Sequence, residues 1–146
     1  MHRILRWTSV ALFLALSLFM LWFGYVYASV TEMLWFHGAA VPAQLHPQIL
    51  PLYLALMNLI GGSSFAAGLL AAYIALFPLR RGATWAAVAL LGGFAIVFIM
   101  AAITAEELAA TTGAPTSWHI MGVLLAITAV GFLAHVVAAR GASKNA

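Results

Sequence analysis

Four long stretches of apolar residues, separated by short polar segments, dominate the pattern of the chain. They cover about residues 7–30, 49–77, 84–110 and 117–139. A helix rises 1.5 Å per residue, so each stretch is long enough to cross the ~30 Å hydrocarbon core of a bilayer. The pattern predicts an all-α protein: an integral membrane four-helix bundle in a single transmembrane domain over residues 1–146.

Composition supports a membrane protein and excludes several other classes. Of the 146 residues, 66% are hydrophobic and only 6% are charged, whereas soluble domains are about 25% charged. The six basic residues are scattered, so they do not form a nucleic-acid-binding patch. The absence of cysteine excludes disulfides, iron–sulfur clusters and thiolate-bound zinc. The expected partner is therefore the lipid bilayer, and no nucleic acid is expected.

The charged residues predict an orientation. The basic residues all fall at the N-terminus, at the C-terminus or between the second and third stretches: Arg3, Arg6, Arg80, Arg81, Arg140 and Lys144. The three acidic residues, Glu32, Glu106 and Glu107, fall in the two other connections. Because basic residues concentrate on the cytoplasmic side of membrane proteins, we expect both termini in the cytoplasm.

The first stretch also has features of a secretory signal peptide. A basic start precedes an apolar run, and "VYA" before Ser29 is similar to a cleavage site. The apolar run is, however, about twice the usual length of a signal core. We therefore expect an uncleaved first transmembrane helix.

Carboxylate and imidazole side chains gather at the predicted outer end. This set comprises Glu32, His37, His46, Glu106, Glu107 and His119. Such ligands suit zinc, copper or iron, but no pair has a diagnostic spacing such as His-x-x-x-His. We expect mostly interfacial side chains and assign no metal site and no catalytic residue. If a site exists, Glu107 and His119 are its preferred members, because a short turn joins their helices.

The second stretch carries small and polar residues at helical spacing. Asn58, Gly61, Phe65, Gly68 and Ala72 share a predicted packing face, with Ala67 and Ala71 off it. Small residues allow close helix approach, and we expect Gly92 and Gly93 in the third stretch to provide the matching surface. Asn58 is expected either to bond across helices or to anchor a ligand headgroup. The candidate cofactor-binding residues are thus Asn58, Glu107 and His119, with a quinone as the candidate cofactor.

One segment resembles a known family. "LYLALMNLIGGSSFAAGLLAAYIALFPLRRGATWA", residues 52–86, is similar to the middle of small bacterial DoxX-like membrane proteins, and "TGAPTSW" is similar to the segment before their last helix. The resemblance implies a four-helix protein of the bacterial inner (cytoplasmic) membrane, with some relatives associated with quinone-linked oxidoreductases. It carries over no site residue, and the lack of cysteine departs from the redox-active members.

Two functions remain open from the sequence. The leading interpretation is a non-catalytic accessory or structural subunit of a larger membrane complex, because the loops are short and no residue set suits catalysis. The alternative is a quinone- or cofactor-binding redox membrane protein that uses the outer Glu/His cluster. The first interpretation implies other membrane subunits as partners, whereas the second implies a small lipid-soluble ligand.

Overall fold

The computed structural model describes residues 2–143, with side chains described for residues 2–141. It is all-α, as predicted. The elements in chain order are α1 (His2–Ala28), α2 (Trp35–Gly38), the short 3-10 turn η1 (Ala43–Leu45), α3 (His46–Ile74), the π-helical turn η2 (Ala75–Leu79), α4 (Thr84–Thr112) and α5 (His119–Ser143).

Four of these helices are long and apolar enough to cross a membrane, which confirms the predicted number of spans. They cover His2–Ala28, Ala43–Leu79, Thr84–Thr112 and His119–Gly141. The first helix begins before the apolar stretch because Arg3 and Arg6 belong to its first two turns. The chain is a multi-pass integral membrane protein whose outward apolar side chains contact lipid.

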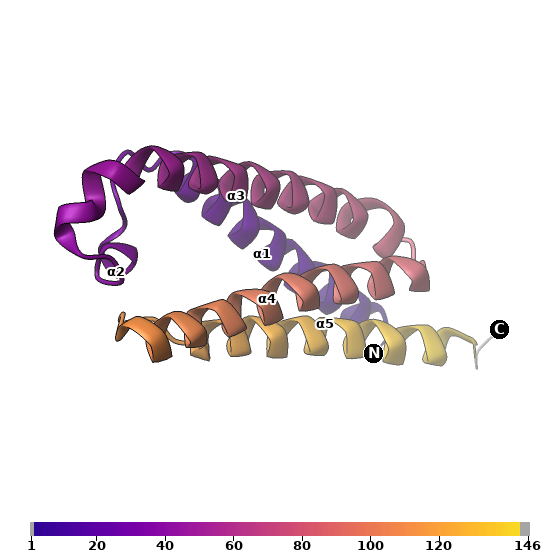
Figure 1. Cartoon of the computed structure of the whole chain (residues 1–146). Coiled ribbons are helices and arrows are strands. Elements are labelled where there is room, and N and C mark those ends of the chain that lie inside the picture. Colours follow the sequence, from indigo (N-terminus) through magenta and orange to yellow (C-terminus); the bar gives the residue numbers. More distant parts are fainter. Residues whose placement is uncertain (1, 144–146) are drawn as a thin grey trace.

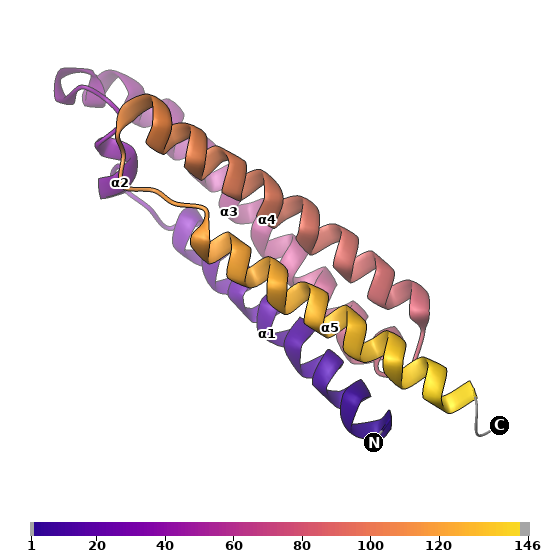
Figure 2. The same ribbon diagram turned by 90° about the horizontal axis from the view of Figure 1, so that it is seen from below.

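The helices form an open bundle in which α1 is central. It packs against α3 and α5, and α4 packs against α5. The start of α1 and the end of α5 lie beside the turn between η2 and α4, which we call the terminal end; α2 and the connection 113–118 lie at the far end (Figures 1 and 2). The helices α3 and α4 meet at the terminal end and diverge toward the far end (Figure 1).

The predicted clustering of charge agrees with this arrangement. Arg3, Arg6, Arg80, Arg81 and Arg140 all belong to the terminal end, and Lys144 lies outside the described residues. Among the residues described, the acidic side chains all belong to the far end. Which end faces the cytoplasm remains a prediction.

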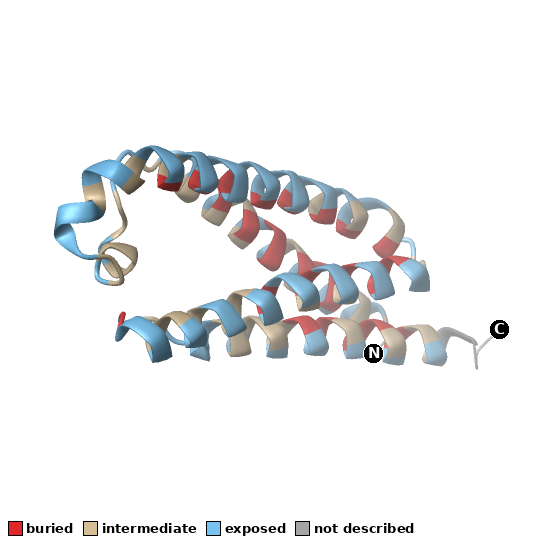
Figure 3. Ribbon diagram, viewed as in Figure 1, coloured by how far each residue is buried: buried red, intermediate tan, exposed pale blue. Residues whose placement is uncertain are grey.

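The buried core lies in the half of the bundle near the terminal end. Phe13 stacks against Phe94 with ring centroids 6.2 Å apart, and Phe94 stacks against Phe98 at 5.7 Å. Buried positions on α4 and α5 gather toward the terminal end, whereas those on α3 follow its α1-facing side along much of its length (Figure 3). The core therefore closes one half of the bundle and leaves the far half open between α3 and α4.

The contact between α1 and α3 explains part of the predicted small-residue face. A Cβ added to Gly61 would lie 2.7 Å from the carbonyl oxygen of Gly24, and a Cβ added to Gly68 would lie 3.0 Å from the carbonyl oxygen of Ser17. Gly61 and Gly68 therefore bring the two backbones together, as small residues do in membrane helices.

The rest of that predicted face was wrong. The buried residues of α3 are Tyr53, Met57, Gly61, Ser64, Gly68 and Ala71, so the packed face shares Gly61 and Gly68 with the predicted one but includes Met57 and Ser64 in place of Asn58 and Phe65. Asn58 and Phe65 are exposed, and Ala71 is buried. The predicted partner was also wrong, because a Cβ at Gly92 or Gly93 would meet no atom within 4 Å. The matching surface is provided by α1, through Gly24 and Ala28.

Candidate functional site

A cleft of about 940 Å³ occupies the space where α3 and α4 diverge. We call it the α3/α4 cleft. Its lining comes from α1, α2, α3, α4, the connection 113–118 and the start of α5. The contributions from α3 (residues 57–67) and α4 (residues 96–108) place it in the far half of the membrane span.

The walls of the α3/α4 cleft are mostly apolar. Its floor includes Phe19 and Phe23 of α1 and Phe98 of α4, and Phe19 meets Phe98 edge-on at 6.3 Å. Two residues at its α4 border are largely exposed, Ile96 at 66% and Met100 at 58%. Because this border lies within a membrane-spanning helix, the cleft opens sideways toward lipid.

Several hydroxyl groups line the α3/α4 cleft but are already used within the chain. Ser63 donates to the carbonyl of Ile60 at 3.0 Å, and Thr104 donates to that of Met100 at 2.9 Å. Thr116 donates to the carbonyl of Ala105 at 2.7 Å and so ties the connection 113–118 to α4. These hydroxyls satisfy the backbone and offer no free proton to a ligand.

One polar group at the far end of the cleft is positioned differently. His37 of α2 lines the cleft, and its Nδ1 lies 2.9 Å from the hydroxyl oxygen of Tyr53 on α3. The same oxygen accepts a hydrogen bond from the backbone N–H of Leu34 at 3.2 Å. The His37 ring also meets Tyr27 edge-on at 6.4 Å and packs against Phe36 at 4.4 Å. These contacts hold α2 and its histidine against α1 and α3.

Partial burial also affects the charge of His37. Removal from solvent disfavours the imidazolium and lowers the pKa of His37 below its ordinary value of about 6.5. Burial therefore favours the neutral ring of His37, in which one ring nitrogen is a donor and the other an acceptor.

The three predicted cofactor-binding residues lie elsewhere. Asn58, Glu107 and His119 are all exposed, and none of them lines the α3/α4 cleft. The Nδ1 atom of His119 lies 2.6 Å from the hydroxyl of Ser117, and its ring stacks on Trp118. No hydrogen bond joins any two of the three within residues 2–143. A binding role for them remains a prediction separate from the cleft.

The far-end carboxylates and imidazoles are dispersed. Within the described part of the chain, no three His, Asp or Glu side chains lie close enough together to hold a metal ion. His37 pairs with Tyr53, His46 donates through Nε2 to the carbonyl of Val41 at 2.9 Å, and His119 pairs with Ser117.

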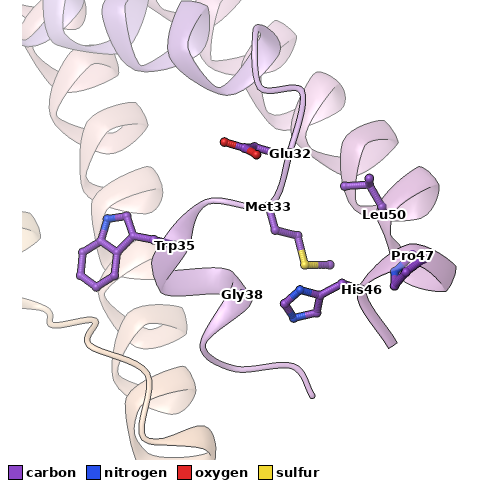
Figure 4. Close-up of a pocket in the computed structure, with 7 residues that line it drawn as sticks. All are labelled: Glu32, Met33, Trp35, Gly38, His46, Pro47 and Leu50. Carbon is purple, nitrogen blue, oxygen red and sulfur yellow. The ribbon is translucent and has the colours of Figure 1, made fainter. Parts of the chain in front are cut away.

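A smaller pocket of about 500 Å³ lies between α2 and the start of α3. Its lining includes Glu32, Met33, Trp35 and His46. The Met33 side chain extends toward His46, whereas the Glu32 carboxylate points away from it (Figure 4). The polar groups of this pocket do not converge, so the α3/α4 cleft is the stronger candidate site.

Comparison with known proteins adds no family: no family model, no curated protein and no solved structure matches the chain.

Proposed function

We propose that this membrane protein binds a quinone, a lipid-soluble ring carrying carbonyl groups, in the α3/α4 cleft. The observation that carries the proposal is the combination of a largely apolar cleft open to lipid with a restrained histidine, His37, at its far end. Ligand sites typically measure about 300–1,000 Å³ and pair apolar walls with a few placed polar groups. A cleft of about 940 Å³ fits that description.

The position of the cleft supports a ligand that enters from the bilayer. The exposed border at Ile96 and Met100 gives a lateral entrance for a hydrophobic tail. His37 belongs to α2, in the connection between two spans, where a polar head reaches the membrane interface. The orientation with both termini cytoplasmic, in the bacterial inner membrane, belongs to the same proposal and rests on the basic residues and the DoxX-like segment.

This proposal reverses the order of the two functions favoured by the sequence alone. Quinone binding was the alternative there and relied on Asn58, Glu107 and His119. The cleft provides a different set of residues, centred on His37, and it is the reason for placing binding first.

The proposal is tested by equilibrium binding of a short-chain ubiquinone to the purified protein in lipid nanodiscs. We expect saturation at one quinone per protein. Ala101 lines the cleft, so Ala101→Phe should occupy part of it and weaken binding about ten-fold or more. Ala89 is exposed on the same helix away from the cleft, so Ala89→Phe should leave binding unchanged. Non-saturable uptake, or equal effects of the two variants, would overturn the proposal.

A second candidate, the accessory subunit, is favoured by a separate observation on α3. Asn58, Gly62 and Ala66 are spaced four residues apart and are all exposed. A Cβ at Gly62 would meet no atom within 4 Å, and Asn58 has no hydrogen-bond partner among residues 2–143. An amide facing lipid without a partner is unfavourable, whereas small residues at this spacing suit a close helix contact. This face supports association with another membrane helix.

A further inference from the structure

We infer that the terminal end binds the phosphate headgroup of one anionic phospholipid, at the junction where α1 packs against η2 and the turn that follows it. The binding groups are the guanidinium groups of Arg6 and Arg80, and the Trp7 ring lies beside the second of them. Neither arginine lines the α3/α4 cleft, so the inference does not depend on quinone binding.

The two arginines span this junction in opposite directions. Arg80 extends from the turn to α1, where its guanidinium carbon lies 5.4 Å from the centre of the Trp7 ring. Arg6 extends from α1 to the turn, where a Cβ added to Gly82 would lie 3.6 Å from its guanidinium carbon. Gly82 has a φ of +90°, a conformation that favours glycine, so the backbone beside Arg6 carries no side chain. The packing of α1 on the turn thus places two positive groups at one junction.

Neither guanidinium is neutralised by an acidic side chain. The three glutamates of the chain belong to the far end, about 30 Å or more along the helices from these arginines. Within residues 2–143, no oxygen accepts a hydrogen bond from Arg6 or Arg80. Each guanidinium has five N–H donors in a planar fork, which matches the oxygens of a phosphate. A phosphate at this junction would supply both the missing negative charge and the missing acceptors.

The position of the junction in the membrane indicates a lipid phosphate. Two tryptophans at the terminal end are exposed, Trp7 by 47% and Trp85 by 62%. Exposed tryptophan rings at the ends of spanning helices lie at the level of the lipid headgroups. Because Arg80 contacts Trp7, its guanidinium lies at the same level, where the phosphates of the bilayer are concentrated. Basic residues at this depth attract anionic lipids, of which phosphatidylglycerol is a simple example.

The contacts of Arg6 and Arg80 distinguish a site from a general attraction by positive charge. Arg81 is adjacent in sequence and exposed, but its side chain makes no hydrogen bond, ion pair or ring contact within the described part of the chain. A guanidinium that is already held in place loses less conformational freedom on binding than a free one. Removing Arg6 or Arg80 should therefore weaken lipid binding more than removing Arg81, although each change removes one positive charge.

The experiment is native mass spectrometry of the purified protein in detergent, titrated with dioleoyl phosphatidylglycerol. We expect one lipid to bind tightly to the wild-type protein and to the control variant Arg81→Gln. Arg6→Gln and Arg80→Gln should weaken this binding about ten-fold. Trp7→Leu keeps every charge but removes the ring beside Arg80, so it should weaken binding about three-fold. Circular dichroism of each variant shows whether its helices are retained.

Two competitors identify the chemistry of the bound group. Dioleoyl phosphatidylcholine has the same chains and a phosphate but no net charge, so we expect it to bind at least about ten-fold more weakly. Inorganic phosphate at the same concentration should not displace the lipid. Equal affinity for the two lipids, or displacement by inorganic phosphate, would overturn the assignment to an anionic lipid. Equal weakening by Arg6→Gln, Arg80→Gln and Arg81→Gln would reduce the effect to total charge and overturn the site.

Discussion

Gly24 of α1 and Gly61 of α3 bring the two helices into direct backbone contact. A Cβ placed on either glycine would lie 2.7 Å from the carbonyl oxygen of the other. Cβ atoms essentially never approach other atoms so closely, so neither position accepts a larger residue without a shift of the backbone. This contact fixes α3 on α1, while α4 follows α5, and the cleft lies between the two pairs.

Replacing Gly61 should therefore destabilise the fold. We expect Gly61→Leu to lower the free energy of unfolding by about 3 kcal/mol or more, because the obstructing atoms belong to the backbone of α1 and cannot rotate away. Gly92→Leu is the control, since a Cβ there meets nothing within 4 Å. Unfolding in detergent, followed by circular dichroism, measures both variants. Similar losses at the two positions would contradict the packing described.

Quinone binding should weaken in acid. The pKa of His37 is lowered by burial, so the folded protein prefers the neutral ring, and the stability from this preference is lost as the pH falls below about 6.5. A protonated Nδ1 can no longer accept from Tyr53 and instead donates to its oxygen, which leaves the Tyr53 hydroxyl proton without an acceptor in the described chain and weakens this restraint on α2. The titratable side chains in contact with the ring are Tyr27 and Tyr53.

We therefore expect lower quinone affinity at pH 5 than at pH 7.5 in the wild-type protein. His37→Gln removes the titrating group, so its affinity should change little over the same range. A decline of the same size in both proteins would assign the effect to another group.

The exposed face of α3 predicts association through Asn58. If a second membrane helix forms a hydrogen bond with the Asn58 amide, Asn58→Leu should reduce the yield of crosslinks between this chain and that helix in native membranes. Gly62→Leu should reduce the yield further, because a larger side chain prevents the two helices from approaching closely. Leu69→Ala, exposed on the same helix, serves as the control. Crosslinking that is unaffected by both Asn58→Leu and Gly62→Leu would remove the basis for an accessory-subunit role.

The orientation can be measured by thiol labelling, because the chain has no cysteine of its own. A membrane-impermeant maleimide should label Glu107→Cys in intact cells and Arg81→Cys only after the cells are permeabilised. This result follows from the collection of basic residues at the terminal end. The reverse labelling pattern would contradict cytoplasmic termini.

Apolar length and charge placement were sufficient to predict the four helices and the shared end of their basic residues. Gly61 and Gly68 were identified as packing residues because small side chains at helical spacing permit close approach. The packing face of α3 was predicted wrongly because Asn58 was assumed to point inward. Met57 and Ser64 are the residues that point inward. Met57 and Asn58 differ by about 100° around the helix, and a helix with apolar residues on all sides does not reveal by periodicity which of them points inward.

The candidate site was harder to predict for a different reason. His37 and Tyr53 are 16 residues apart, and their contact depends on how the connection after α1 folds back onto α3. His37 was recognised only as one of several far-end histidines, and Tyr53 was not singled out at all. Residue spacing cannot identify a cleft formed by the divergence of two helices, because the separation of α3 and α4 depends on packing elsewhere.

The most direct test of quinone binding is photolabelling with an azido-quinone in native membranes, followed by mass spectrometry of the labelled peptides. We expect label on cleft residues, namely α4 between 96 and 108 and α2 around His37, and competition by unmodified quinone. An azido-phospholipid provides the control for general lipid contact. Label spread over the exposed faces of all four long helices, in the same pattern as the phospholipid and without competition, would contradict a quinone site in the α3/α4 cleft.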